Sequence, residues 1–481
     1  MTAAIPVERM LAMPAKVLCS AIWVSGRDPD EAMPNSVFFA TPPDLRALMT
    51  VDIDREQRSV RISMTLDDAT VPRLIEVYRR MYPAFTADWW EEAQRLLAQG
   101  SVTRTAQYLG DQGSIILPVD GSGLRFEPAP VESSLPPASD LEWPMGDVSP
   151  GATSSAGRTR TDEAAELAFA DPDACTAAFL AVHRGQIVAE QYAPGLGPET
   201  QLESWSMGKS LTATLVGLLI EQGYVGLDDP APVPAWRVPG DSRGEIRVAD
   251  LMRMSSGLKF SGMTDSREHW DQGVADHLLV YSDSIDVFDF ATSRPLEFPA
   301  NMVGRYRNCD PLALGDIVKR TVTEQLGEQY LTWPQRALFD RIGIRRQVME
   351  TDAWGNFILT GFDYGTARNW ARLGMLYLND GVWEGERLLP EGYASFVGTP
   401  APAWEQPEYG GQFWVNGTGD YDLPEDVYYM RGAGEQRVLI VPSHDLVVVR
   451  LGHRRGDAAA REPLNDALRA LTAAVEAGAG V

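Results

Sequence analysis

The sequence is poor in the residues from which disulfide frameworks and metal sites are built. Its 481 residues include three cysteines, too few for a disulfide framework and nowhere at C-x-x-C spacing: Cys19, Cys175 and Cys309. The five histidines never stand four residues apart, the spacing at which two helical histidines bind one metal ion. We therefore predict a protein that uses neither a metal ion nor another cofactor.

Lysine is also scarce, because only four of the 42 basic residues are lysines, at positions 16, 209, 259 and 319. A lysine inside a motif is therefore more informative here than in most sequences. The 67 acidic residues give a formal net charge of −25, and no block of basic residues interrupts this acidity. Since binding to a phosphate backbone depends on clustered positive charge, we expect no nucleic-acid partner.

Long hydrophobic runs are absent too. The longest nearly apolar stretches, Val17–Val24 and Leu215–Ile220, are far shorter than the ~18–20 residues that a membrane span needs. Glu8 and Arg9 interrupt the start of the chain, so no secretory signal is expected there. The compartment stays open: periplasmic if a signal peptide was removed, otherwise cytoplasmic. The oligomeric state is open as well.

The chain divides at a stretch rich in proline, serine and glycine. We predict a small α+β region at 1–130, a connector at 131–160 and a larger domain at 161–481. In the first region, Val60–Leu66 and Thr105–Tyr108 favour strands and Trp89–Ala98 favours a helix. No motif indicates a role for this region.

The larger domain carries two predicted hairpins. Ala177–His183 and Gln186–Gln191 flank the turn Arg184-Gly185, and Val438–Val441 and Leu446–Leu451 flank a four-residue turn. Helices are predicted over Asp162–Phe169 and Glu462–Val475. Strand hairpins at both ends, a helical middle and a terminal helix indicate an antiparallel sheet covered by helices, an α+β fold.

The strongest chemical signal is Ser206-Met207-Gly208-Lys209, followed by leucines at 211, 215, 218 and 219 on one stripe. The predicted helix ends near Gly223, is ~17 residues long and is expected to be buried on all sides. Ser206 and Lys209 would lie one turn apart on the same face. Burial and the helix dipole both disfavour an ammonium there, so the lysine amine is expected to be neutral and able to accept the serine proton. The alternative is a capping serine and a surface lysine.

Two similar motifs elsewhere predict no such chemistry. Ser256–Lys259 is also S-x-x-K, but Gly257 interrupts it and no long apolar helix follows, so it predicts a turn. Gly240–Gly244 fits the G-x-S-x-G pattern, which needs a buried strand before it. Pro232, Pro234 and Pro239 precede it, so a loop is expected.

Two further elements are weak alone. Tyr306 and Asn308 would point to the same side if the backbone is extended, although a surface turn is the simpler interpretation. Gly432–Gln436 leads into a strand over Arg437–Val441. Glycines beside a strand let backbone N–H groups approach a substrate oxygen, whereas the simpler interpretation is a bulge or turn.

With these elements in this order, the chain resembles the serine β-lactamase and penicillin-binding protein family. The likeness is greatest to its class C-like esterases, D-aminopeptidases, nylon-oligomer hydrolases and linear-peptide hydrolases, some of which cleave opened cyclic-peptide toxins. The resemblance covers roughly Glu163 to Ala473. Besides the elements above it includes Val182–Tyr192, Trp205–Leu219, Gly226–Pro230, Met254–Leu258, Ala367–Arg372 and Gly381–Trp383.

The resemblance implies an antiparallel sheet covered by helices, an all-helical region and an acyl-enzyme mechanism without a metal. Ser206 would attack a carbonyl carbon, Lys209 would accept its proton, and Tyr306 would pass it to the leaving group. Asn308 would hold Lys209 or the substrate. The substrate-binding strand would carry Ala433, Gly434, Glu435 and Gln436, and the N–H groups of Ser206 and Ala433 would bind the oxyanion.

One departure from the family bears on substrate choice. The third motif usually carries Lys-Thr-Gly or a histidine, where this chain has Ala433-Gly434-Glu435. If Glu435 faces the cleft, it would repel a substrate carboxylate, so we expect weak hydrolysis of penicillins and cephalosporins. The leading expectation is cleavage of an acyclic amide or peptide bond in a small molecule or linear peptide. A carboxylesterase and a non-catalytic ligand-binding or sensor domain are the alternatives.

Overall fold

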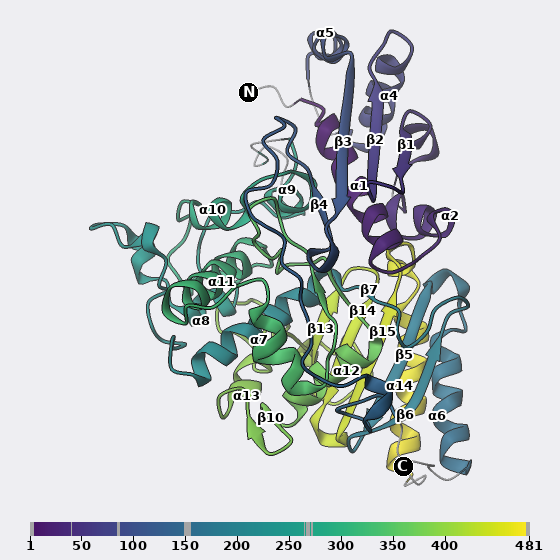
Figure 1. Ribbon diagram of the computed structural model, residues 1–481, viewed down its shortest axis with the longest axis vertical. Coiled ribbons are helices and arrows are strands. Elements are labelled where there is room, and N and C mark those ends of the chain that lie inside the picture. Colours follow the sequence, from purple (N-terminus) through teal and green to yellow (C-terminus); the bar gives the residue numbers. More distant parts are fainter. Residues whose placement is uncertain are drawn as a thin grey trace. The chain divides into compact units, whose positions relative to one another are not determined.

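The computed structural model describes residues 4–39, 41–83, 87–148, 155–263, 265, 270 and 273–477. The chain forms two compact units (Figure 1). The N-terminal unit contains Met1–Pro128 together with Phe260–Val287 and Glu350–Asn356, and the C-terminal unit contains the remainder. The domain boundary predicted near residue 130 stays a prediction. In the structure, the N-terminal unit also includes two later segments of the chain. Residues 149–154 of the predicted connector lie outside the described residues.

A four-stranded antiparallel sheet forms the centre of the N-terminal unit, with its strands side by side in chain order. Alternating side chains of β2 are buried, Val60, Ile62 and Met64, because one face of the sheet is covered by α1. The elements of this unit are α1 (Val7–Trp23), α2 (Pro29–Ala32), α3 (Pro43–Arg46), β1 (Thr50–Asp54), β2 (Ser59–Thr65), α4 (Thr70–Met81), α5 (Trp89–Gln99), β3 (Ser101–Tyr108), β4 (Ser114–Ile116) and α9 (Asp276–Ser282).

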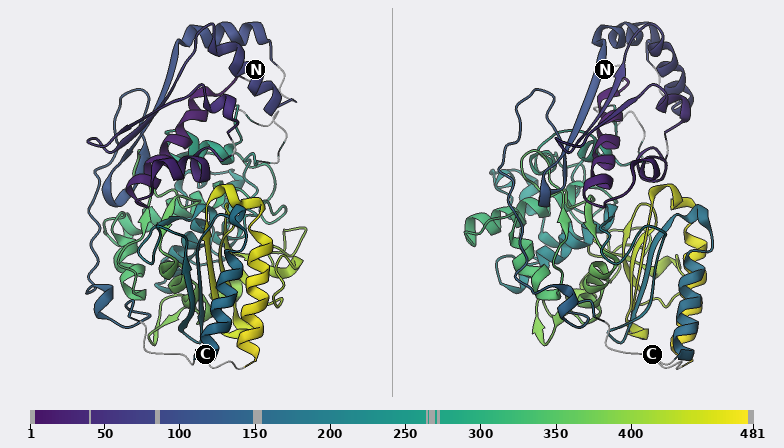
Figure 2. Two further views of the ribbon diagram at one scale, coloured as in Figure 1. Left: turned by 90° about the vertical axis from the view of Figure 1, so that its right-hand side faces the viewer. Right: turned by 45° about the vertical axis from the view of Figure 1, so that its right-hand side comes forward.

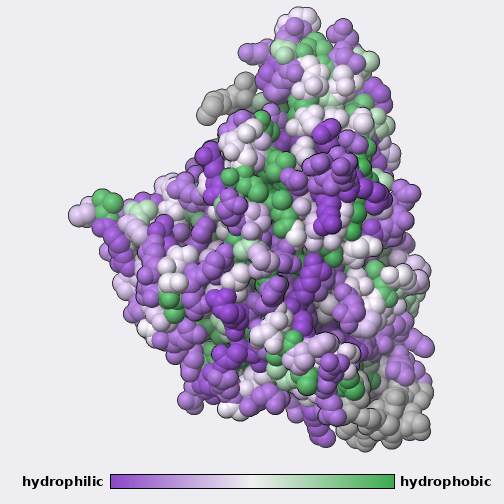
Figure 3. All heavy atoms as spheres, viewed as in Figure 1, coloured by the Kyte–Doolittle hydropathy of each residue, from purple (hydrophilic) through white to green (hydrophobic). Residues whose placement is uncertain are grey.

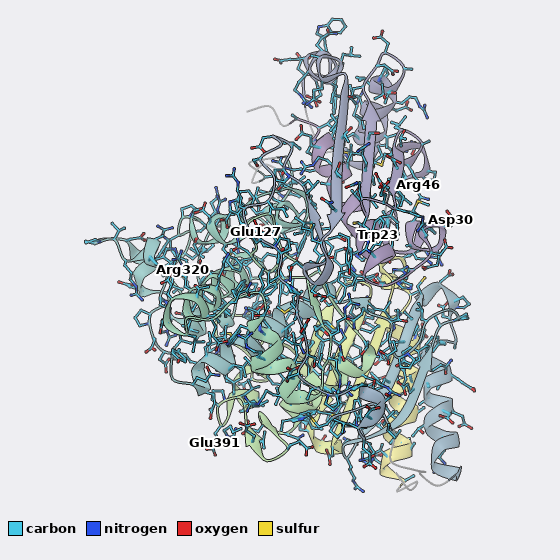
Figure 4. All side chains as sticks on the ribbon, in the orientation of Figure 1. Trp23, Asp30, Arg46, Glu127, Arg320 and Glu391 are labelled. Carbon is cyan, nitrogen blue, oxygen red and sulfur yellow. The ribbon has the colours of Figure 1, made fainter. Side chains whose placement is uncertain are left out.

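The predicted strands and helix of the first region are present as β2, β3 and α5. Helix α1, whose last residue Trp23 is labelled in Figure 4, was not predicted. Pro14 lies inside it, and proline is a poor indicator of a helix interior. The helix forms nonetheless because its apolar side chains are buried against the sheet, so tertiary packing outweighs local propensity.

A buried ion pair joins α1 to a distant segment within the N-terminal unit. Lys16 Nζ lies 2.7 Å from Glu350 Oε2, and both side chains are almost completely buried. Glu350 also accepts hydrogen bonds from the Ser20 hydroxyl at 2.6 Å and the Ser114 N–H at 2.7 Å. Loss of either charge would therefore destabilise the fold, because a buried charge without a counter-ion is costly in free energy.

The C-terminal unit is built on a six-stranded antiparallel sheet in the order β12-β13-β14-β15-β5-β6. Both predicted hairpins are confirmed: β5 (Thr176–His183) pairs with β6 (Gln186–Tyr192), and β14 (Gln436–Val441) pairs with β15 (Leu446–Gly452). In the first turn Arg184 and Gly185 both have positive φ, as a two-residue hairpin requires. The sheet is completed by β12 (Trp414–Val415) and β13 (Tyr428–Gly432).

Helices cover both faces of this sheet (Figure 2). On one face lie α6 (Ser155–Ala168) and α14 (Arg461–Glu476), the two predicted helices, packed side by side over a core that includes Leu439 and Val448. On the other face lies α12 (Ala367–Leu378), where Gly374 is in contact with Val438 and Val447. Alternate residues of the same strands therefore supply two hydrophobic layers.

The helical region contributes the remaining elements. They are α7 (Gly208–Glu221), α8 (Val248–Met252), α10 (Val287–Thr292, at the boundary between the units), α11 (Cys309–Arg320) and α13 (Tyr393–Val397), a small sheet of β7 (Leu202–Glu203), β8 (Val348–Met349) and β9 (Asp363–Gly365), and the hairpin β10 (Val382–Trp383) with β11 (Glu386–Arg387). Gly240–Gly244 follows no strand, which excludes the buried strand that its pattern needs, but the predicted loop contains the start of a short 3₁₀ helix, Ser242–Glu245. Ser256–Lys259 contains no helix, and Leu258 forms an isolated bridge with Leu296.

Within the described residues, no helix is both long and apolar enough to cross a membrane. Hydrophilic residues cover most of the face seen in Figure 3, with hydrophobic residues in small groups between them.

Lys16→Met tests the buried ion pair. The substitution leaves the Glu350 carboxylate buried without its counter-ion, so we expect the free energy of unfolding to fall by about 3–5 kcal/mol. Urea denaturation followed by circular dichroism measures it. Lys259→Met is the matched control, because Lys259 is exposed and its loss should change stability by no more than about 0.5 kcal/mol. Equal effects of the two substitutions would contradict the assignment.

Candidate active site

Ser206 lies in a tight turn directly before a buried helix. Residues Trp205–Met207 form one 3₁₀ turn, η5, and α7 follows from Gly208, so the predicted helix is present but begins two residues after the serine. Trp205 has a φ of +46°, a left-handed conformation that a bulky residue adopts only when its surroundings hold it there. Ser206 is partly exposed, whereas Met207 and Lys209 are buried. The turn thus presents the serine hydroxyl at a surface.

Lys209 reaches back to this hydroxyl. Its Nζ lies 3.1 Å from Ser206 Oγ and donates a 2.9 Å hydrogen bond to the carbonyl of Thr360. Burial lowers the pKa of the Lys209 amine well below its ordinary value, and the negative charge of Asp363 opposes part of that shift. The sequence-based expectation of a buried lysine within reach of the serine therefore agrees with the geometry.

Tyr306 completes the cluster. Its ring centroid lies 4.9 Å from Lys209 Nζ. Burial raises the pKa of its phenol to about 12, although a hydrogen bond with Ser206 and the charges of Arg431 and Arg437 act in the opposite direction. At neutral pH the phenol is therefore protonated and can donate a proton, whereas Lys209 is the group whose pKa burial shifts downward.

An aromatic wall surrounds the phenol. The rings of Trp414 and Tyr409 lie 5.3 Å and 5.9 Å from that of Tyr306, and Trp404 stacks on Tyr409 at 4.6 Å. The Arg431 guanidinium lies 4.7 Å from the Trp414 ring and 3.8 Å from the Asp420 carboxylate. Tyr306, Trp404 and Trp414 are partly exposed and Tyr409 is buried, so this aromatic wall is partly open to solvent.

Asn308 is completely buried at the start of α11, a helix that ends at Arg320 (Figure 4). Its backbone has φ −92° and ψ −18°, a helical rather than extended conformation, so Asn308 itself does not continue an extended segment. The residue between it and Tyr306, Arg307, donates to the carbonyl of Leu258 at 2.7 Å. Asn308 thus follows the phenol at the entry to a helix.

The glycine-flanked segment lies next to the serine turn and leads into the predicted strand, which is β14. Both β13 and β14 pack on η5, and Ala433–Glu435 form the turn between these two strands. A β-carbon at Gly432 would lie 2.0 Å from the Ser204 carbonyl oxygen, so only glycine fits. Asp457 accepts the N–H groups of Gly434 and Glu435, whereas among the described residues the N–H of Ala433 meets no acceptor.

The predicted repulsion of a substrate carboxylate required the side chain of Glu435 to face the cleft, but this side chain is directed toward other residues of the protein. It is buried, lies 2.6 Å from Arg437, and accepts a 2.7 Å hydrogen bond from Tyr421, which belongs to the core beneath α6 and α14. Its charge is therefore neutralised, and the expected repulsion of a substrate carboxylate loses its basis. Gln436 is buried too and bonds both the N–H and the carbonyl of Gly452.

The partners of Lys209 and the aromatic wall were not predicted from the sequence. Thr360 acts through its backbone carbonyl, which no side-chain pattern can indicate. Asp363 belongs to no motif. The aromatic side chains were detectable, since Trp404, Tyr409 and Trp414 occur within eleven residues, but their contact with Tyr306 spans a hundred residues of sequence. Among the described residues, no group of three or more His, Cys, Asp and Glu side chains is arranged to hold a metal ion.

Comparison with known proteins identifies the family. A profile of the family described as Beta-lactamase matches residues 165–473, more than half of the chain. The chain belongs to the beta-lactamase family. As a member of this family it has an α+β beta-lactamase fold, as the sequence-based resemblance implied.

Among known members, the chain is similar to the 6-aminohexanoate-dimer hydrolase of Paenarthrobacter ureafaciens, with 25% identity over 233 residues. The match covers 47% of this beta-lactamase-family chain and 57% of that relative, so it spans little more than half of the relative's length.

Two solved structures share the fold. A Bacillus anthracis protein assigned as a 6-aminohexanoate-dimer hydrolase has a TM-score of 0.51 and 20% identity, covering 64% of this chain and 80% of its own. SurE with D-Leu has a TM-score of 0.51 and 19% identity, covering 66% and 76%.

Gly432→Ala tests the close approach of β13 to the serine turn. Its methyl group would meet a backbone oxygen, so β13 or η5 must shift, and we expect the rate of labelling by a fluorophosphonate probe to fall at least about tenfold. Gly197→Ala is the control, because nothing lies within 4 Å of its β-carbon and its φ is not positive. An unchanged labelling rate in Gly432→Ala would refute the close approach.

Proposed function

We propose that the protein cleaves an acyclic amide or peptide bond through an acyl-enzyme formed on Ser206. The observation that carries this proposal is the 3.1 Å contact between Ser206 Oγ and the buried amine of Lys209. A serine hydroxyl is a weak nucleophile until a neighbouring base removes its proton, and a desolvated lysine is such a base at neutral pH.

The assignment of base and acid follows from the opposite directions of the two pKa shifts. The amine of Lys209 is favoured in its neutral form and accepts the proton of Ser206 as its oxygen attacks the substrate carbonyl carbon. The phenol of Tyr306, with a pKa of about 12, stays protonated and delivers a proton to the leaving nitrogen. The Lys209 ammonium then restores the phenol proton. Water attacks the ester on Ser206 in the reverse sequence of transfers.

The tetrahedral intermediate carries a negative oxygen that needs two donors. The N–H groups of Ser206 and Ala433 are proposed for this role, since those of Gly434 and Glu435 already bind Asp457. Asn308 is proposed to hold Lys209 or the substrate from the start of α11. Gly434, Glu435 and Gln436, which were expected on the substrate-binding strand, are proposed here only to support the turn that carries Ala433.

The substrate class is inferred from the surroundings of the serine and from the relative. The Paenarthrobacter ureafaciens protein is named as a hydrolase of the 6-aminohexanoate dimer, a linear amide. An aromatic wall beside Tyr306 suits the hydrocarbon part of such a chain or the side chains of a linear peptide, including an opened cyclic peptide. Weak turnover of β-lactams is still proposed, now because Ala433 and Gly434 offer no side-chain donor.

Ser206→Ala and Lys209→Ala should each lower kcat/KM by about a thousandfold or more, because the two residues act as one unit. The double variant should be no worse than either single variant. Lys259→Ala, in the other S-x-x-K segment, is the matched control and should retain turnover. Strictly additive losses in the double variant would argue against a shared unit.

Tyr306→Phe should lower kcat about 100-fold or more with little change in KM, since its proton is needed in the transition state. Tyr409→Phe serves as the control: it removes a buried hydroxyl from the same wall, 3.3 Å from Gln412 Oε1, and should act far more weakly. A near-normal kcat for Tyr306→Phe would remove the phenol from the mechanism.

A substrate panel tests the bond that is cleaved. It contains the linear 6-aminohexanoate dimer, short peptides, p-nitrophenyl esters and nitrocefin, each measured with the wild type and Ser206→Ala. We expect the largest serine-dependent kcat/KM on a linear amide. Nitrocefin turnover above that of every amide would overturn the proposal. If no fluorophosphonate probe labels the protein, the result would favour a non-catalytic binding domain.

A further inference from the structure

A buried carboxylate lies directly behind the serine turn. Asp363 begins β9 and is 1% exposed. Strand β9 pairs with β7, the strand that leads into the turn, and the Asp363 carbonyl accepts the Ser204 N–H at 2.8 Å. The Ser204 hydroxyl in turn accepts the Asp363 N–H at 3.2 Å and lies 3.5 Å from its Oδ2. The backbone and the side chain of Asp363 therefore both lie next to Ser204, two residues before the proposed nucleophile Ser206.

The same carboxylate also touches the residue that precedes Lys209. A β-carbon at Gly208 would lie only 1.9 Å from Asp363 Oδ2, so the carboxylate occupies the space that any other residue would need. This explains the glycine in Ser206-Met207-Gly208-Lys209 in terms of packing. Ser206 is thus flanked by two contacts of one side chain, at Ser204 and at Gly208.

The charges around Lys209 come from few sources. Asp363 supplies a negative charge that acts on the amine. Tyr306 is protonated, and Arg431 on β13 and Arg437 on β14 act on that phenol. On α11, Asp310 lies 3.5 Å from Arg307 and binds the Ser256 hydroxyl, so its charge is largely compensated. Ser206 and the Thr360 carbonyl are neutral partners of the amine.

We propose that Asp363 is a positioning residue of the reaction: its buried carboxylate holds Ser204 and Gly208 on either side of the nucleophile and supplies the negative charge that faces Lys209. The inference rests on the proposed function, in which Lys209 is the base. It adds a group that touches neither the substrate nor the reacting atoms but controls the strength of that base.

The sign of the effect is fixed by electrostatics. A negative charge stabilises the ammonium form, so removing it lowers the pKa of Lys209 beyond what burial does alone. The amine would then stay neutral to lower pH, and the acid limb of the pH–rate profile would move downward. A weaker base also accepts the serine proton less readily, so the plateau rate would fall.

Asp363→Asn tests this, because the amide keeps the shape and loses the charge. The readout is the second-order rate of fluorophosphonate labelling between pH 4 and 10, with folding checked by thermal denaturation. We expect the acid limb to move to lower pH by about half a unit or more and the plateau to fall about tenfold. If Asp363→Asn does not fold, Asp363→Ser, which is smaller, gives the same readout.

Asp340→Asn is the matched control for a purely structural effect. Asp340 is another buried carboxylate, bound by Ser133, Ser134 and Gln335, and its loss should lower the melting temperature without moving the acid limb. An acid limb that stays in place in a folded Asp363 variant, while Lys209→Ala abolishes labelling, overturns this inference alone. Full labelling of Lys209→Ala would instead overturn the proposed function.

Discussion

The chemistry of this site depends on the removal of one lysine from water. Lys209 is placed in the first turn of a helix that is buried on nearly every side, and this burial lowers the pKa of its amine well below the ordinary value, as the proposed role of base requires. The same burial requires partners for the amine, which the Thr360 carbonyl and the Ser206 hydroxyl provide. Helix α7, the turn before it and the segment 357–363 thus form one arrangement around a single desolvated nitrogen.

The elements that the sequence predicted well are those with local signals. The hairpin turn Arg184-Gly185, the terminal helix and the apolar helix after Ser206 each carry their own periodicity or turn residues, and each is present. Ser206 and Lys209 belong to the same category, since three residues of spacing at a helix start bring them together whatever the rest of the chain does.

The features that escaped prediction are set by tertiary contacts. Helix α1 contains Pro14 and forms because the sheet beside it is apolar. The orientation of Glu435 depends on Arg437 and Tyr421 being within reach, which strand alternation alone leaves undecided. The Thr360 carbonyl and Asp363 act on Lys209 across about 150 residues of chain, a relation that no local sequence pattern indicates.

The N-terminal unit includes two segments from the later part of the chain, Phe260–Val287 and Glu350–Asn356. Both segments fall inside residues 165–473, the part that matches the family profile. The N-terminal unit is therefore not an appendage that could be exchanged or cut away at a linker. A chain beginning at Ala129 would leave Glu350 without Lys16, ten residues before the carbonyl that binds the Lys209 amine. Cutting the chain there would therefore divide the N-terminal unit itself.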